Sequence, residues 1–382
     1  MTALQLPPLS LYIHIPWCIR KCPYCDFNSH ESASAIPEAD YVQQLLHDLE
    51  QDLPLVQSRP LTSIFFGGGT PSLFSATAIA ELLKGVADRV AWSEDIEITL
   101  EANPGSAEAE KFAGFAEAGI NRLSIGVQSF NNAHLQTLGR VHDSQQALAA
   151  VGLARQAGIN RINLDLMHGL PDQDADSALA DLDTAIGLNP DHLSWYQLTI
   201  EPNTRFYSHP PLLPEEEALA DIQDAGEDRL ANAGYQHYEV SAYARDGSYS
   251  RHNMNYWGFG DYLGIGAGAH AKLTDLDQQT VTRYSRTRAP ADYLRCSDNF
   301  QAQRRQLDRA DLGAEFMLNN LRLIHGFALA DFGPRTGQDI QQLQPRIDDL
   351  LRRELLEKEG GYLRTTRLGM RFLDTVVGEF FE

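Results

Sequence analysis

The chain has 382 residues, of which 43 % are hydrophobic and 22 % charged, as is usual for a globular protein larger than one small domain. Its net charge of −21 repels phosphate backbones, so we expect no nucleic-acid partner and at most weak association with anionic membranes. No apolar run is long enough for a transmembrane segment, and the first residues are unlike a signal peptide. We therefore expect a cytoplasmic protein.

In chain order, short apolar segments bounded by Gly, Pro, Asn or Asp alternate with helical segments. Strands are predicted at Leu11–Ile15, Ser63–Phe66, Ile96–Leu100, Arg122–Gly126, Arg161–Leu166 and Leu193–Leu198. Helices are predicted at Tyr41–Gln51, Thr77–Arg89, Ser106–Ala118, Gln145–Gln156 and Ser177–Leu188. Strand–helix units in series predict an α/β fold with a parallel sheet, here a partial (β/α)6 barrel because a complete barrel needs eight units.

The segments that follow the predicted strands carry the most distinctive residues, namely IHIPWC, GGGTP, EANPG, GVQSF, DLMHGLP and TIEP. Ligands of parallel α/β folds bind at the carboxyl ends of the strands. The cysteine loop and the glycine loop should therefore share one mouth of the barrel.

The character of the chain changes after about residue 200, where an aromatic-rich run reads RHNMNYWGFGDYLGIGAGAH. From Gln301 onward helical segments dominate, with a hairpin near the end. We predict a barrel unit over residues 1–270, with its core at 10–200. A smaller, mostly helical and winged-helix-like unit is predicted over residues 271–382.

Three of the four cysteines lie within eight residues, in the spacing C-x3-C-x2-C: Cys18, Cys22 and Cys25. Three thiolates on one loop can ligate three irons of a [4Fe–4S] cluster. A zinc site is the alternative, with His14 or His30 as a further ligand. Cys296 stands alone and is expected to be a structural thiol.

The C-x3-C-x-Y-C loop, followed one strand later by GGGTP, resembles the radical S-adenosylmethionine (SAM) superfamily. More narrowly, YIHIPWC, EANP, GVQSF and D-x-M-x-G-L-P are similar to oxygen-independent coproporphyrinogen III oxidase and its relatives, clearly over roughly residues 10 to 270. The resemblance implies that the fourth iron is left open for SAM. It also implies electron transfer from the reduced cluster to SAM, which yields methionine and a 5′-deoxyadenosyl radical.

The same resemblance implies the residues that bind SAM. Those expected to contact SAM or the cluster are Tyr12, Tyr24, Gly68, Gly69, Thr70 and Glu101. Three more match positions that bind a second SAM in the coproporphyrinogen enzyme: Gln128, Arg140 and Asp165. Each of these residues also has a purely structural interpretation. The glycines could form a turn, Tyr12 could be a core aromatic, and Glu101 could cap the next helix. The three second-SAM residues could simply form hydrogen bonds at the barrel mouth.

Two features distinguish this chain from the coproporphyrinogen enzyme. Phe27 stands where that enzyme has a further cysteine. The run HNMNYW resembles the HNxxYW motif of HemW-type haem chaperones, which bind haem and pass it to apo-haemoproteins such as those of the respiratory chain. The motif implies His252 as haem ligand with Tyr256 and Trp257 against the porphyrin, although a lone histidine is usually an ordinary hydrogen-bonded residue. We predict a radical SAM haem chaperone, with coproporphyrinogen oxidase as the alternative.

Overall fold

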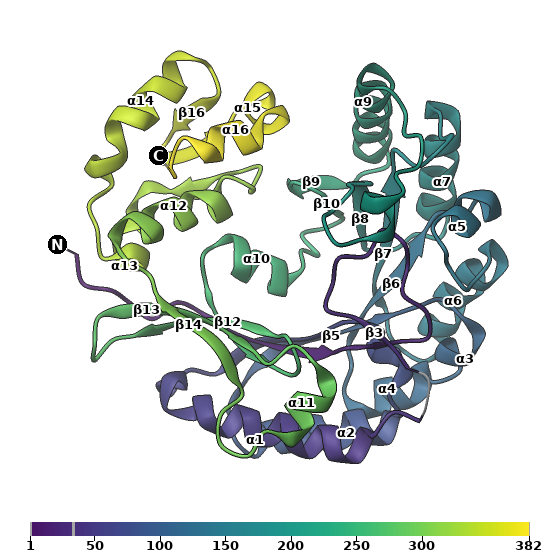
Figure 1. Ribbon diagram of the computed structural model, residues 1–382. Coiled ribbons are helices and arrows are strands. Elements are labelled where there is room, and N and C mark those ends of the chain that lie inside the picture. Colours follow the sequence, from purple (N-terminus) through teal and green to yellow (C-terminus); the bar gives the residue numbers. More distant parts are fainter. Residues whose placement is uncertain (1, 33–34, 382) are drawn as a thin grey trace.

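The computed structural model describes residues 2–32 and 35–381 (Figure 1). Its main sheet contains all six predicted strands, which pair in parallel and in chain order. They are β1 (Leu9–Ile15), β4 (Leu61–Gly68), β5 (Trp92–Ala102), β6 (Arg122–Gln128), β7 (Arg161–His168) and β8 (His192–Gln197). The predicted barrel-type α/β fold is confirmed, and every strand except β8 is longer than expected.

The sheet also extends at both ends beyond these six strands. β11 (Asp261–Ile265) pairs in parallel with β1, although about 250 residues separate them in the chain. Antiparallel strands continue the sheet past β11, and a short hairpin continues it past β8. These are β12 (His270–Asp275), β13 (Thr280–Arg286) and β14 (Gln301–Gln306), and, at the other end, β9 (Gln236–Glu239) and β10 (Ala242–Ala244).

Helices cover the outer face of this curved sheet (Figure 1). They are α1 (Glu38–Val56), α2 (Ala76–Ala87), α3 (Ser106–Ala109), α4 (Phe112–Ala118), α5 (Asn132–Thr137), α6 (Ser144–Gln156), α7 (Ala175–Gly187) and α9 (Glu216–Asn232). The single helix expected over residues 106–118 is wrong, because the chain breaks between α3 and α4. At the break, the Nζ of Lys111 donates to the carbonyls of Ser72 and Leu73, at 3.1 and 2.8 Å.

A short helix occupies the inner side of the curve. This helix, α10 (Arg251–Trp257), carries the HNMNYW run and packs against β1, β4 and β11 (Figure 1). It also contacts α12 (Arg309–Asn320) of the C-terminal unit. Because outer helices cover the other face, β1 is buried along almost its whole length.

The C-terminal unit has its own hydrophobic core, formed around Phe316, Met317, Phe332 and Leu363. Its remaining elements are β15 (Phe327–Ala328), α13 (Leu329–Thr336), α14 (Gln344–Arg352), β16 (Leu356–Glu359), β17 (Tyr362–Thr365), α15 (Arg367–Arg371) and α16 (Leu373–Gly378). The expected boundary at residue 271 falls within β12, and β12 to β14 belong to the main sheet. We propose a boundary near residue 307 instead. In the described residues no helix is long and apolar enough to cross a membrane.

Candidate functional site

The three clustered cysteines lie on one loop at the carboxyl end of β1. Cys18 ends β2 (Trp17–Cys18), which pairs with β3 (His30–Glu31), and the other two cysteines lie between these strands. Cys18 is buried, whereas Cys22 and Cys25 are half-buried. Each thiol has its own polar neighbour: Thr70 Oγ1 lies 3.7 Å from Cys18 Sγ, Arg140 Nη1 3.6 Å from Cys22 Sγ and Ser29 Oγ 3.7 Å from Cys25 Sγ.

The donor set fits an iron–sulfur cluster better than zinc. A cubane cluster takes one thiolate on each of three irons, and three thiols of one loop supply that set. The two histidines considered as zinc ligands are engaged elsewhere. His14 is bonded through Nδ1 to the Tyr12 hydroxyl and through Nε2 to the Asn28 carbonyl, both at 2.9 Å. His30 Nε2 lies 3.4 Å from Asn28 Oδ1.

The glycine loop after β4 is joined to the cysteine loop by backbone hydrogen bonds. The Gly69 amide donates to the Ile15 carbonyl at 2.8 Å, and the Thr70 amide donates to the Trp17 carbonyl at 2.7 Å. A Cβ at position 69 would lie 2.5 Å from the Trp17 carbonyl oxygen, so this close approach requires glycine. The structure thus brings two predicted motifs together at one mouth.

Glu101 faces this loop from the end of β5. The Gly68 amide donates to Glu101 Oε2 at 3.1 Å, and both residues line a pocket of about 470 Å³ together with Tyr12. Burial, and then the negative charge of Asp165, raise the pKa of Glu101 to about 8. The alternative role as a helix cap finds no support, because the residue that caps α3 is Gly105, without a side-chain bond.

The residues expected at a second SAM molecule lie outside the lining of this pocket and are hydrogen-bonded to other residues of the protein. The Tyr196 hydroxyl donates to Gln128 Oε1 at 2.8 Å. Arg140 Nη2 donates to the Gly126 carbonyl at 2.7 Å. Asp165 accepts from Ser124 Oγ and Asn163 Nδ2, at 3.0 and 2.8 Å. All three residues therefore form hydrogen bonds within the barrel, as the structural interpretation expects. Tyr24 lies at the same mouth, its ring centroid 6.4 Å from that of Phe206.

His252 is placed behind the site rather than in the pocket. Only 7 % of its surface is exposed, and its ring stacks on Phe65 with centroids 4.4 Å apart. Tyr12 and Tyr256 flank it at 6.1 and 4.7 Å. Burial lowers the pKa of His252 to about 3, so the imidazole is neutral. Its Nδ1 is buried without a hydrogen-bond partner.

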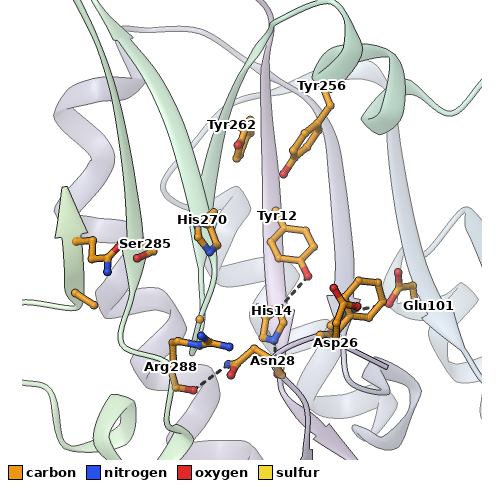
Figure 2. A pocket seen from close by; sticks show the side chains of 15 residues that line it. Tyr12, His14, Asp26, Asn28, Glu101, Tyr256, Tyr262, His270, Ser285 and Arg288 are labelled. Atoms are coloured by element: carbon orange, nitrogen blue, oxygen red, sulfur yellow. Dashed lines mark hydrogen bonds between the residues drawn. The ribbon is translucent and has the colours of Figure 1, made fainter. Parts of the chain in front are cut away.

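The pocket continues from Glu101 past Tyr12 to the antiparallel end of the sheet, where the sequence had pointed only to Tyr256 (Figure 2). This end is lined by Tyr256, Tyr262, Gly268, His270, Ser285, Arg288, Ala302 and Gln303. The aromatic-rich run RHNMNYWGFGDYLGIGAGAH, which spans α10, β11 and the start of β12, was the available signal. The run does not reveal that β11 pairs with β1, and this pairing puts the run beside the cysteine loop.

Residues 12–185 match the Radical SAM superfamily and residues 307–372 the HemN C-terminal domain. With the fold and the cysteine loop, these matches define a radical SAM protein. The "Heme chaperone HemW" of Haemophilus influenzae is 49 % identical, over 98 % of both chains. That of Escherichia coli is 48 % identical, over 99 % of both. The chain therefore belongs to the HemW family of radical SAM proteins.

The chain is also similar to a more distant relative and to a solved structure. "Radical S-adenosyl methionine domain-containing protein 1, mitochondrial" of Mus musculus is 36 % identical, over 96 % of this chain and 86 % of its own. The structure of coproporphyrinogen III oxidase (HemN) from Escherichia coli superposes with a TM-score of 0.82 at 23 % identity, covering 98 % of this chain and 90 % of that one. The latter similarity shows a shared fold.

Proposed function

We propose that this chain is a radical SAM haem chaperone, which binds haem as cargo and passes it to apo-haemoproteins such as those of the respiratory chain. The observation that carries the proposal is the near-full-length similarity to two proteins named haem chaperone. The HNMNYW helix also lies on the inner side of the sheet, where its Tyr256 lines the pocket.

The radical SAM family implies a [4Fe–4S] cluster and SAM. We propose that Cys18, Cys22 and Cys25 hold the cluster, which when bound can supply an electron to SAM. Gly68, Gly69 and Thr70 would place their backbone, and Glu101 its carboxylate, around the methionine end of SAM, with Tyr12 and Tyr24 beside it. We assign Gln128, Arg140 and Asp165 to the mouth, where a second SAM would meet them. Their internal hydrogen bonds hold the walls of this space in place.

The place of His252 sets a condition on its proposed role as a haem ligand. A neutral imidazole is a common ligand of haem iron. In this structure, however, the ring is stacked on Phe65 behind Tyr12. His252 can therefore reach a haem only if α10 moves or the Tyr12 ring swings away.

Coproporphyrinogen oxidation is the alternative activity, and Phe27 weighs against it. This residue stands in place of the further cysteine and is 61 % exposed at the edge of the pocket. An exposed aromatic side chain suits contact with a flat apolar cargo better than ligation of a metal.

The test is a comparison of both activities in one anaerobic preparation with reconstituted cluster. Haem titration should give a Soret band that co-elutes with the protein in gel filtration. Incubation with SAM, a reductant and coproporphyrinogen III should give no protoporphyrinogen. Decarboxylation without haem binding would overturn the proposal.

A further inference from the structure

The end of the pocket that faces away from Glu101 has an aromatic wall. Tyr256 from α10 and Tyr262 from β11 stack with ring centroids 4.1 Å apart and planes 22° apart. Tyr262 is held in this position by Arg283, whose Nη1 donates to the tyrosine hydroxyl at 2.7 Å. The exposed ring of Phe27 lines the same pocket from the cysteine loop. Flat aromatic surfaces of this kind suit a planar, largely apolar ligand.

Two histidines line the pocket, and they differ in what their nitrogens do. Both ring nitrogens of His14 are engaged, by the Tyr12 hydroxyl and the Asn28 carbonyl. His270, at the start of β12, is exposed to the pocket, and in the described part of the chain its ring has no hydrogen-bond partner. Desolvation at the pocket wall, and then the guanidinium groups of Arg283 and Arg288, lower the pKa of His270. A neutral imidazole with a free lone pair is the form that binds haem iron.

A cation lies beside this histidine. Arg288 lines the pocket below His270 and is exposed, and no carboxylate of residues 2–32 or 35–381 forms an ion pair with it (Figure 2). In a chain of net charge −21, such an arginine is available for an anionic ligand. Its backbone is anchored, because Asn28 Nδ2 donates to the Arg288 carbonyl at 2.9 Å. The same nitrogen donates to the Ala267 carbonyl, also at 2.9 Å.

We infer that haem binds in this end of the pocket, with His270 as an axial ligand of the iron and Arg288 paired with a propionate carboxylate. Tyr256, Tyr262 and Phe27 would contact the porphyrin. The inference rests on the proposed chaperone function and adds the site to it. In this arrangement the HNMNYW helix contributes to the haem site without moving. Its Tyr256 lines the pocket, and its His252 packs against Tyr12 and Phe65 behind the pocket wall.

The first experiment compares His270→Ala with His252→Ala by haem titration of the full-length protein with its cluster in place. His325→Ala is the matched control, since His325 is exposed on the C-terminal unit and lines no part of the pocket. His270→Ala should weaken haem binding by about tenfold or more and change the ligand-field bands, and added imidazole should restore them. His252→Ala should keep the wild-type ligand-field bands.

The second experiment tests Arg288 with haem and haem dimethyl ester as the two probes. Wild type should prefer the free acid, and Arg288→Gln should reduce that preference by about tenfold, because one charge-assisted hydrogen bond is lost. Arg304→Gln is the control, as this arginine lies on β14 outside the pocket lining. The ester measurement separates loss of a propionate contact from general damage to the protein.

The outcomes separate the site from the function. If His252→Ala loses haem and His270→Ala binds it with unchanged spectrum, the inferred site is wrong and the chaperone function stands. The site is equally wrong if Arg288→Gln keeps the full preference for the free acid. If wild type binds no haem at all, the proposed function itself fails.

Discussion

The amide of Gly68 donates a hydrogen bond to Oε2 of Glu101 at 3.1 Å, and this bond joins the loop after β4 to the carboxylate at the end of β5. It orients the carboxylate at the pocket, and it depends on a backbone conformation that L side chains rarely adopt. Gly68 has φ +117°, and a Cβ there would run into the His14 ring. The contact and the conformation can be tested separately.

Gly68→Ala should lower the free energy of unfolding by about 2–4 kcal/mol, because backbone strain and overpacking add. Gly158→Ala is the matched control. Gly158 also has a positive φ, +86°, but a Cβ there would meet no atom within 4 Å, so only about 1–2 kcal/mol should be lost. Denaturant unfolding measures both, and SAM binding should weaken in the Gly68 variant alone. Equal losses with normal SAM binding would show that the contact with His14 is unimportant.

The raised pKa of Glu101 predicts how stability depends on pH in the ligand-free protein. Its pKa is about 8 in the folded chain against an ordinary 4.5, so the folded state holds the proton more tightly. The stabilisation from this proton is complete below pH 4.5 and is lost as the pH rises to about 8. Glu101→Gln should remove on the order of 4 kcal/mol of this decline, measured by unfolding at pH 5 and 8.5.

Glu94→Gln is the control for that measurement, because Glu94 is exposed at the opposite end of β5. Its profile should follow the wild type, including the decline that Asp165 contributes through its own raised pKa. An unchanged decline in Glu101→Gln would mean that this carboxylate is ionised in the folded protein.

The cysteine variants test the cluster. Serine at position 18, 22 or 25 should abolish the iron and acid-labile sulfide of the reconstituted protein, because each thiolate serves a different iron. Cys296→Ser should retain both, since that residue lies after α11 (Pro290–Arg295), where its Sγ donates to the Asp292 carbonyl. Zinc without sulfide in the wild type would refute the cluster.

Phe27 offers a test of the pocket rim. Phe27→Ser should leave stability unchanged, because 61 % of the side chain is exposed, but should weaken haem binding by about fivefold through lost apolar contact. Ile19→Ser is the control on the same loop, 54 % exposed and outside the pocket lining. The same loss of haem affinity in both variants would point to a general effect on the loop.

The features that the sequence predicted correctly are those encoded by a few neighbouring residues. The six parallel strands, the cysteine loop and the glycine loop follow from runs of a few residues each, and the structure confirms the strands and brings the loops together. The break at Lys111 was missed because α3 and α4 together have the composition of one helix. The pairing of β11 with β1 was missed because no local pattern identifies a partner so far away in the chain.

The same limit explains the assignments around the haem motif. His252 was singled out by its motif, yet the α10 backbone turns its ring toward Phe65. His270 carries no motif of its own and enters the pocket through the β11–β12 connection beside the cysteine loop. The direction of a side chain on a helix of only about two turns depends on tertiary packing, which residue spacing does not encode.

The most direct test of the account is haem transfer from the loaded protein. One equivalent of haem is bound to the cluster-containing protein, free haem is removed, and a purified apo-haemoprotein of a respiratory chain is added. The account predicts that the acceptor gains its holo-spectrum and activity while the donor loses its Soret band. The account would be contradicted if the haem stays on the donor. It would also be contradicted if the acceptor incorporates no more haem from the donor than from the same concentration of free haem.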